Sequence, residues 1–252
     1  MRGRLLAFAI LCGLAWPGRV VLADTLATDI SSHLVQISSS FTGTSLLVFG
    51  AVEAEGPGRR DVVVVLRGPE RPVTVRRKEH RFGIWLNAAA TTYGGVPGFF
   101  AVATTRPLDQ VAAPGELARH QLDIPYLRLE ANTTTPDPAA DADFRTALVR
   151  LKTAEGLYGG AALPVTFSAA NLFRAEFRVP SNMPPGSYKV EAYLYRDGEL
   201  VAAQSSPLFV DKSGFERSLF TLSRQRPAIY ATIAIILAVA AGWLAAYVFR
   251  RP

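Results

Sequence analysis

Residues 71–87 contain the densest group of side chains in this sequence that could do chemistry. The stretch reads RPVTVRRKEHRFGIWLN, with four cations packed closely together and aromatic residues beside them. Guanidinium and ammonium groups bind anions, and a tryptophan next to them can anchor a contact. The pattern therefore predicts a contact surface for a small anion, lipid head groups or an acidic partner. It also fits a solvated strand edge, where charge discourages aggregation between sheets. The candidate interaction residues are Arg76, Arg77, Lys78, Arg81 and Trp85.

The sequence offers little material for catalysis or for metal binding. His33, His80 and His120 are far apart, and none of them forms a close-spaced ligand pair. The sequence also lacks a G-x-S-x-G elbow, a Walker loop and a G-x-G-x-x-G motif. A triad assembled from distant positions would still allow a membrane-tethered hydrolase. We expect a non-enzymatic protein with no catalytic residues, no cofactor and no metal site.

An apolar segment near the end of the chain determines where the rest of the protein, including the basic stretch, is held. Residues 228–249 read AIYATIAIILAVAAGWLAAYVF and contain no charged residue. A helix of this length reaches about 33 Å, close to the roughly 30 Å hydrocarbon core of a bilayer. We therefore predict one transmembrane helix, followed by a short tail at 250–252.

Small residues recur every four positions along the predicted span, at Ala234, Ala238, Gly242 and Ala246. This spacing places them on one ridge, where a second helix can approach closely. Alanine-rich spans also produce such ridges by chance. The ridge is therefore a candidate helix-packing surface.

The start of the chain has the three parts of a secretory signal. Arg2 and Arg4 precede a short apolar run, and Val21-Leu22-Ala23 has small residues at the outer positions of a cleavage site. We predict a signal peptide at 1–23, with an uncleaved signal anchor as the alternative. The single cysteine, Cys12, lies inside this segment, so the mature chain would form no disulfide.

The charge of the chain is concentrated at its ends. The formal net charge is +6; it falls to +3 without the three arginines of the signal and to +1 without Arg250 and Arg251. The nearly neutral remainder gives no electrostatic reason to bind nucleic acid. A cleaved signal places that remainder outside the cytoplasm, and the terminal arginines favour a cytoplasmic C-terminus. We expect a single-pass inner (cell) membrane protein whose bulk is periplasmic.

Two β-rich segments flank a different middle. The run Val62–Leu66 is apolar at every position, which predicts a strand covered on both faces. In the second segment, Asp197-Gly198 between two alternating stretches predicts a type I′ hairpin turn. Between the segments, Phe144, Ala147, Leu148 and Leu151 have helical spacing, with Asp141 or Asp143 as the cap and Gly156 as the stop. This helix is expected to pack on a sheet.

These patterns predict a mainly β fold, with one or more immunoglobulin-like β-sandwich ectodomains, a connecting amphipathic helix and one C-terminal transmembrane helix. They leave open whether the two β-rich segments form one domain or two. A capping box at Ser213–Glu216 predicts a short juxtamembrane helix. The predicted divisions are 1–23 signal peptide, 24–106 first β-rich domain, 107–160 linker with the amphipathic helix, 161–211 second β-rich segment, 212–227 juxtamembrane helix, 228–249 transmembrane helix and 250–252 cytoplasmic tail.

Several motifs together resemble the alphaproteobacterial putative transmembrane protein family. They are Phe41-Thr42-Gly43-Thr44, Asp61-Val62-Val63-Val64-Val65, Gly83-Ile84-Trp85-Leu86-Asn87, Asn171-Leu172-Phe173-Arg174, Pro185-Gly186-Ser187-Tyr188 and the terminal stretch from Trp243 to Arg251. The resemblance implies a single-span envelope protein of unknown function with no assigned catalytic residues. It also implies an occasional genetic association with sulfite-exporter-like permeases, and hence a transporter-accessory role.

Two functions follow as expectations. The first is an accessory or assembly partner of another integral membrane protein, such as a sulfite-exporter-like permease, in contact with the lipid bilayer. The alternative is a periplasmic module that binds or senses a small anion through the cations between Arg76 and Arg81. The single membrane anchor, the nearly neutral ectodomain and the absence of a catalytic motif favour the accessory or assembly role.

Overall fold

The computed structural model describes residues 25–38, 41–53, 57–132, 138–212 and 222–249. The predicted signal peptide, the capping box at Ser213–Glu216 and the tail at 250–252 lie outside these residues. Those three predictions therefore remain predictions.

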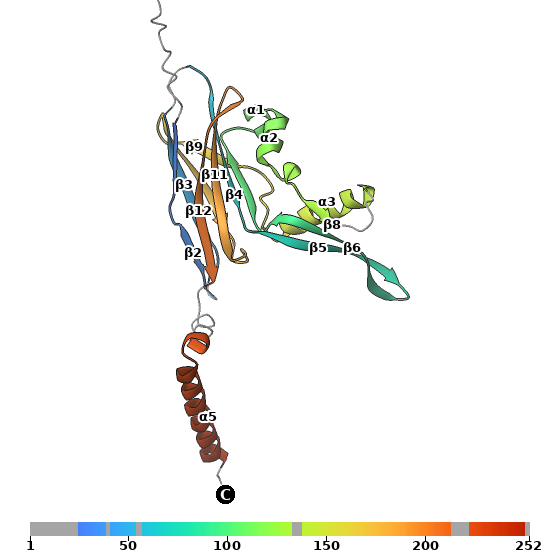
Figure 1. Ribbon diagram of the computed structural model, residues 1–252, viewed down its shortest axis with the longest axis vertical. Coiled ribbons are helices and arrows are strands. Elements are labelled where there is room, and N and C mark those ends of the chain that lie inside the picture. The colour runs from blue at the N-terminus through green and yellow to red at the C-terminus, as the bar shows by residue number, and fades with distance from the viewer. Residues whose placement is uncertain (1–24, 39–40, 54–56, 133–137, 213–221, 250–252) are drawn as a thin grey trace, which may run out of the picture.

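Nine strands form a continuous sheet that folds into a sandwich (Figure 1). Its order is β1-β3-β10-β9-β7-β4-β11-β12-β2, and the parallel pair β9–β7 joins the two layers. We call β1, β3, β10 and β9 the β3 layer, and the other five strands the β4 layer. The predicted mainly β sandwich is confirmed, while an immunoglobulin-like relationship stays a prediction. The strands are β1 (Thr25–Ile30), β2 (Leu34–Ile37), β3 (Thr44–Glu53), β4 (Arg60–Arg67), β7 (Phe100–Thr104), β9 (Leu163–Phe167), β10 (Leu172–Val179), β11 (Gly186–Arg196) and β12 (Glu199–Lys212).

Strands from the two β-rich segments pair with each other. β3 pairs with β10 and β4 pairs with β11, both antiparallel, while β12 pairs with β2 in parallel. The segments 24–106 and 161–211 therefore contribute to the same sheet. In β10, alternate residues are buried and exposed, because successive side chains of a strand point to opposite faces.

The apolar run Val62–Leu66 is fully buried, as its sequence predicts. Val62, Val64 and Leu66 pair with buried residues of β11, and cross-strand partners lie on the same side of a sheet. The three side chains therefore face the β3 layer together with Leu194, Ala192 and Val190. The intervening side chains face outward, where α1 (Leu108–Val111), α2 (Pro114–His120) and η1 (Ile124–Tyr126) cover them (Figure 1). The His120 ring lies 5.2 Å from that of Tyr193 on β11, which places α2 on this face.

A side-chain amide helps to close the other edge of the sandwich. Gln204 of β12 accepts a hydrogen bond from the Thr28 backbone N–H at 2.8 Å and donates one to the Thr28 carbonyl at 3.3 Å. Gln204 therefore takes the place of a neighbouring strand for one residue of β1. This bond pair holds the two layers together where their backbones do not pair.

A second, smaller sheet stands beside the sandwich. β5 (Glu70–Arg81), β6 (Ile84–Pro97) and β8 (Glu130–Asn132) form it in that order, and α3 (Pro138–Ala154) packs on its base (Figure 1). Phe144 and Leu148 of α3 are buried against a group of apolar residues from the two long strands. The predicted packing of this helix on a sheet is confirmed. The apolar residues of that group are Val75, Tyr93 and Val96.

The ends of α3 correct one part of the sequence interpretation and confirm another. The helix begins at Pro138, so Asp141 and Asp143 lie inside it and neither is the cap. Asp141 instead accepts a hydrogen bond from the Tyr93 hydroxyl at 2.8 Å, and Asp143 accepts one from Arg77 at 3.1 Å. Gly156 follows the helix with φ +71°, the left-handed conformation typical of a helix stop.

The predicted type I′ turn is present in the structure. Asp197 and Gly198 join β11 to β12 with φ 48° and 92°, the signs that a type I′ turn requires, so this turn is confirmed. Glycine pairs commonly separate strands, but Gly94-Gly95 lies inside β6. The turn that ends β5 is formed by Phe82 and Gly83.

The C-terminal helix α5 (Pro227–Phe249) is the predicted span, beginning one residue earlier than expected. Its segment Pro227–Tyr247 has a mean hydropathy of 2.2 and none of it is buried against the rest of the protein. Among the described residues, it is the one helix long and apolar enough to cross a membrane. The length of this unburied apolar helix matches the thickness of a bilayer's hydrocarbon core.

Candidate functional site

The predicted interaction residues lie on a projecting hairpin. We call residues 76–90 of β5 and β6, with their connecting turn, the arm; Figure 1 shows it extending away from the sandwich. Val75 and Thr91 are the last buried residues of the two strands, and all residues from Ile84 to Ala90 are exposed. A two-stranded hairpin without a core is only marginally stable in water. The arm therefore depends on its base or on a binding partner for its order.

The tip of the arm carries unusually exposed apolar side chains. Phe82 is fully exposed, Trp85 is 68% exposed and Ile84 is 57% exposed. Phe82 has φ 52° and Gly83 has φ 80°, so the two form a tight turn with the signs of type I′. A bulky residue at positive φ is uncommon, because its Cβ crowds the backbone.

The arm separates the predicted cations onto two faces. Arg76 and Lys78 share one face with His80 and Trp85, since cross-strand partners lie on the same side and His80 pairs with Trp85. The His80 and Trp85 rings meet edge to face at 5.2 Å. Neither Arg76 nor Lys78 has an ion-pair partner among the described residues.

The cations on the opposite face are already paired. Arg77 binds Asp143 at 3.1 Å and lies over the Phe144 ring at 5.3 Å, which ties the base of the arm to α3. Arg81 binds Glu79 at 2.7 Å near the tip. The five predicted residues therefore belong to one structural unit, but they do not converge on a shared pocket.

A second exposed surface was missed by the sequence interpretation. The outer face of the β3 layer bears Phe49, 42% exposed, and Leu172, 52% exposed. They border a hollow of about 500 Å³ whose lining also includes Ala27, Leu47 and Gly50. We call this the β3 hollow. The continuous apolar run at 46–49 conceals it, because a run without alternation does not reveal which face is covered.

Gly50 keeps this layer closely packed. A Cβ at this position would lie 2.3 Å from the Ala27 carbonyl oxygen and 2.8 Å from the Phe173 ring. The close approach of three strands therefore requires glycine here.

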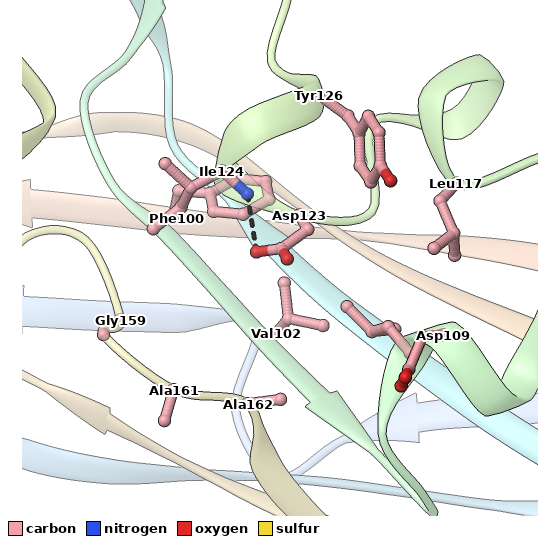
Figure 2. Close-up of a pocket in the computed structure, with 12 residues that line it drawn as sticks. Phe100, Val102, Asp109, Leu117, Asp123, Ile124, Tyr126, Gly159, Ala161 and Ala162 are labelled. Atoms are coloured by element: carbon pink, nitrogen blue, oxygen red, sulfur yellow. Dashed lines mark hydrogen bonds between the residues drawn. The ribbon is translucent and has the colours of Figure 1, made fainter. Parts of the chain in front are cut away.

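A pocket of about 370 Å³ lies between β7 and the helical cover (Figure 2). Phe100, Val102 and Leu117 provide its apolar lining, while Asp109 and Asp123 provide carboxylates. Asp123 accepts a hydrogen bond from the Ile124 N–H at 2.7 Å, so it caps η1. Carboxylates repel an anion, so this pocket does not suit the small-anion ligand that the sequence left open.

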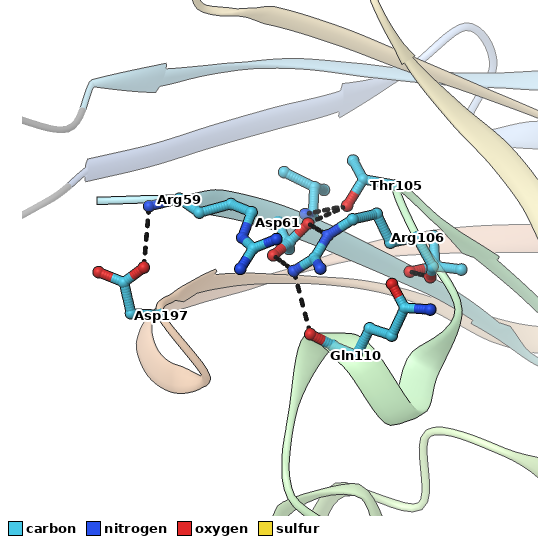
Figure 3. A network of polar contacts seen from close by, with 8 residues as sticks. Arg59, Asp61, Thr105, Arg106, Gln110 and Asp197 are labelled. Carbon is cyan, nitrogen blue, oxygen red and sulfur yellow. Dashed lines mark hydrogen bonds and ion pairs between the residues drawn. The ribbon is translucent and has the colours of Figure 1, made fainter. Parts of the chain in front are cut away.

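A buried ion pair fixes the start of the helical cover (Figure 3). Arg106 donates from Nε to Asp61 at 2.8 Å and from Nη2 to the other carboxylate oxygen. Thr105 donates to Asp61 at 2.9 Å, and Arg106 also donates to the Gln110 carbonyl at 3.0 Å. Burial alone would raise the pKa of Asp61, but these hydrogen bonds and the Arg106 charge lower it below 3.8.

The three histidines have separate structural settings. His33 lies 3.6 Å from Asp29, His120 lies 3.7 Å from Glu116, and His80 contacts Trp85. Within the described ranges, no group of three or more His, Cys, Asp or Glu residues is placed to hold a metal ion.

The small-residue ridge lies along α5. Ala234, Ala238, Gly242 and Ala246 are all exposed, and a Cβ added at Gly242 would meet nothing within 4 Å. This leaves room for a second helix, and packing at the ridge stays a prediction.

The fold and the apolar helix define a membrane-associated, mainly β protein with one C-terminal candidate span. The chain belongs to the family described as "Putative transmembrane protein" (Alph_Pro_TM), whose model matches residues 25–251. This confirms the resemblance found in the sequence. Neither the search of the curated proteins nor that of the solved structures found a match.

Proposed function

We propose that the protein is a non-enzymatic accessory or assembly partner of another membrane protein, such as a transporter. In this proposal α5 anchors it in the inner membrane, the sandwich is periplasmic and the C-terminus is cytoplasmic. The partner binds the outer face of the β3 layer, at the β3 hollow.

The observation that carries this proposal is the difference between the two outer faces of the sandwich. Helices α1 and α2 cover the outer face of the β4 layer and bury its apolar side chains (Figure 1). The described residues include no such cover over Phe49 and Leu172 on the β3 layer. Removing these side chains from water would contribute about 25 cal/mol for each Å² of apolar area buried.

The shape of this face suits a protein partner. A specific interface buries about 800 Å² on each side, and its energy centres on aromatic and apolar residues in a packed setting. Three adjacent strands offer a broad surface, and the β3 hollow of about 500 Å³ can receive a partner's apolar side chain. The small-anion alternative has less support, because the arm's cations lie on two faces of a convex hairpin.

Site-specific photo-crosslinking in intact cells tests the proposal. A photoreactive amino acid at Phe49 is expected to give one discrete adduct, and Leu172→Glu in the same chain is expected to remove it. The same photoreactive group at Leu151, a half-exposed residue of α3, is the matched control and should give no such adduct. Absence of an adduct at Phe49 with normal protein levels would contradict the proposal.

A further inference from the structure

We propose that the tip of the arm docks on the anionic lipid surface of the membrane that holds α5. This inference rests on the membrane anchorage and does not require the protein partner proposed above. The residues that make the contact are Phe82, Ile84 and Trp85 at the tip, with Arg76 and Lys78 behind them.

The side chains of the tip have the composition that membrane interfaces select. Aromatic rings such as those of Trp85 and Phe82 partition to the head-group region, and apolar side chains such as Ile84 enter the acyl boundary. All three are more than half exposed in the isolated chain. Insertion into lipid would remove their apolar surface from water.

Charge on the arm complements an anionic bilayer. Arg76 and Lys78 are exposed, lie on the Trp85 face and have no ion-pair partner among the described residues. Arg77 and Arg81, on the other face, are neutralised by Asp143 and Glu79. The unpaired charge behind the tip is therefore positive, which favours phosphate head groups.

The turn itself indicates that Phe82 serves a contact. Asn or Asp followed by Gly is the preferred pair for a type I′ turn, because asparagine tolerates positive φ. Phe82 has φ 52° and a fully exposed ring, so it stabilises neither the turn nor a core. Strained residues in exposed turns are found where a ligand or surface uses the side chain.

The shape of the arm favours lipid over a folded partner. From Arg76 to Arg81 the strand extends about 20 Å beyond its last buried residue, and it ends in a two-residue turn. Such a narrow convex tip cannot cover the roughly 800 Å² of a specific protein interface. Nine residues, 213–221, separate the sandwich from the described helical residues. Fully extended, at about 3.5 Å per residue, that is about 30 Å of chain, and residues 222–226 add less than about 10 Å before α5, so the sandwich with its arm stays within about 40 Å of the bilayer.

Tryptophan fluorescence of the full chain in lipid nanodiscs tests the proposal. Replacing Trp16 and Trp243 by phenylalanine leaves Trp85 as the only tryptophan of the three. In discs containing phosphatidylglycerol, we expect the Trp85 emission to shift to the blue and to be quenched by lipids brominated near the head group. High salt should reverse this quenching, because it screens the attraction to the anionic lipid. In pure phosphatidylcholine discs, quenching should be weak.

Two outcomes would overturn the proposal. The first is equal quenching by aqueous acrylamide in every disc with none by brominated lipid. The second is protection of Trp85 from both quenchers, because a protein contact would then cover the tip.

Two variants separate docking from a structural role. The double variant Arg76→Gln, Lys78→Gln should lower the ratio of docked to free arm about thirtyfold, because each cation near an anionic surface contributes about 1 kcal/mol. Arg178→Gln with Lys189→Gln, two exposed cations of the sandwich, is the matched control and should change nothing. Phe82→Asn should keep or raise the unfolding temperature, since asparagine suits the turn, yet weaken quenching by brominated lipid. Unchanged quenching in Phe82→Asn would overturn the proposal.

Discussion

Asp61 and Arg106 form a two-point ion pair that joins β4 to the segment leading into α1. The carboxyl group of Asp61 is almost completely buried, and Thr105 supplies a third hydrogen bond to it. A buried carboxylate is tolerated only when its charge is compensated in this way. The pair therefore fixes where the chain leaves the sandwich and begins to cover the β4 layer.

Asp61→Asn is expected to destabilise the protein by about 1–3 kcal/mol near neutral pH, because the charged hydrogen bonds are lost. The folded pKa of Asp61 is lowered, so its contribution is complete above the unfolded pKa of about 3.8 and is lost as pH falls through the folded value. The difference between the two proteins should shrink as pH falls below about 4. Thermal unfolding of the full chain in detergent across acidic pH measures it. A constant difference would contradict the assignment.

Gly50→Ala is expected to destabilise the sandwich by about 1–3 kcal/mol, because the new methyl group meets a backbone oxygen at 2.3 Å. Gly94→Ala in β6 is the control, since its nearest neighbour would lie 3.9 Å away. Urea unfolding of both variants gives the comparison. Equal effects would show that the strands at Gly50 are not closely packed.

Gln204→Ala is expected to free the β1 edge. The Thr28 amide loses its 2.8 Å acceptor, so its hydrogen exchange should accelerate markedly more than that of the Val190 amide in the central β11. Hydrogen-exchange mass spectrometry on the peptides containing these residues measures the change. Uniform acceleration in both peptides would indicate general destabilisation instead.

Gly242→Leu is expected to weaken association of α5 with a partner helix, since leucine blocks the close approach that glycine allows. A membrane two-hybrid assay reports the association, with Ile236→Leu as a control that preserves size and polarity. An unchanged signal for Gly242→Leu would remove the packing role of the ridge.

Local sequence patterns predicted the elements whose environment is local. The uncharged stretch at 228–249 predicted α5, and Asp197-Gly198 predicted the turn between β11 and β12. The interleaving of the two β-rich segments was left open, because pairs such as Phe209 with Leu34 join residues far apart in the chain. Local periodicity carries no information about such pairing.

The exposed surfaces were harder to predict, for a physical reason. The runs at 46–49 and 62–66 look alike in sequence, yet only the second is covered on both faces. Whether the outer face of a strand is covered depends on where α1 and α2 pack, and the residues of the strand do not determine that. The Phe82-Gly83 turn was missed because phenylalanine is not a turn-former at positive φ.

The topology of the chain is the central claim, and cysteine labelling tests it most directly. The only native cysteine is Cys12, so Cys12→Ser provides a cysteine-free background. Cysteines introduced at Ser187, exposed on β11, and at Pro252 are treated in intact spheroplasts with a membrane-impermeant maleimide. The account predicts labelling at 187 before lysis and at 252 only after lysis. Labelling at 252 in intact spheroplasts, or protection of 187, would contradict it.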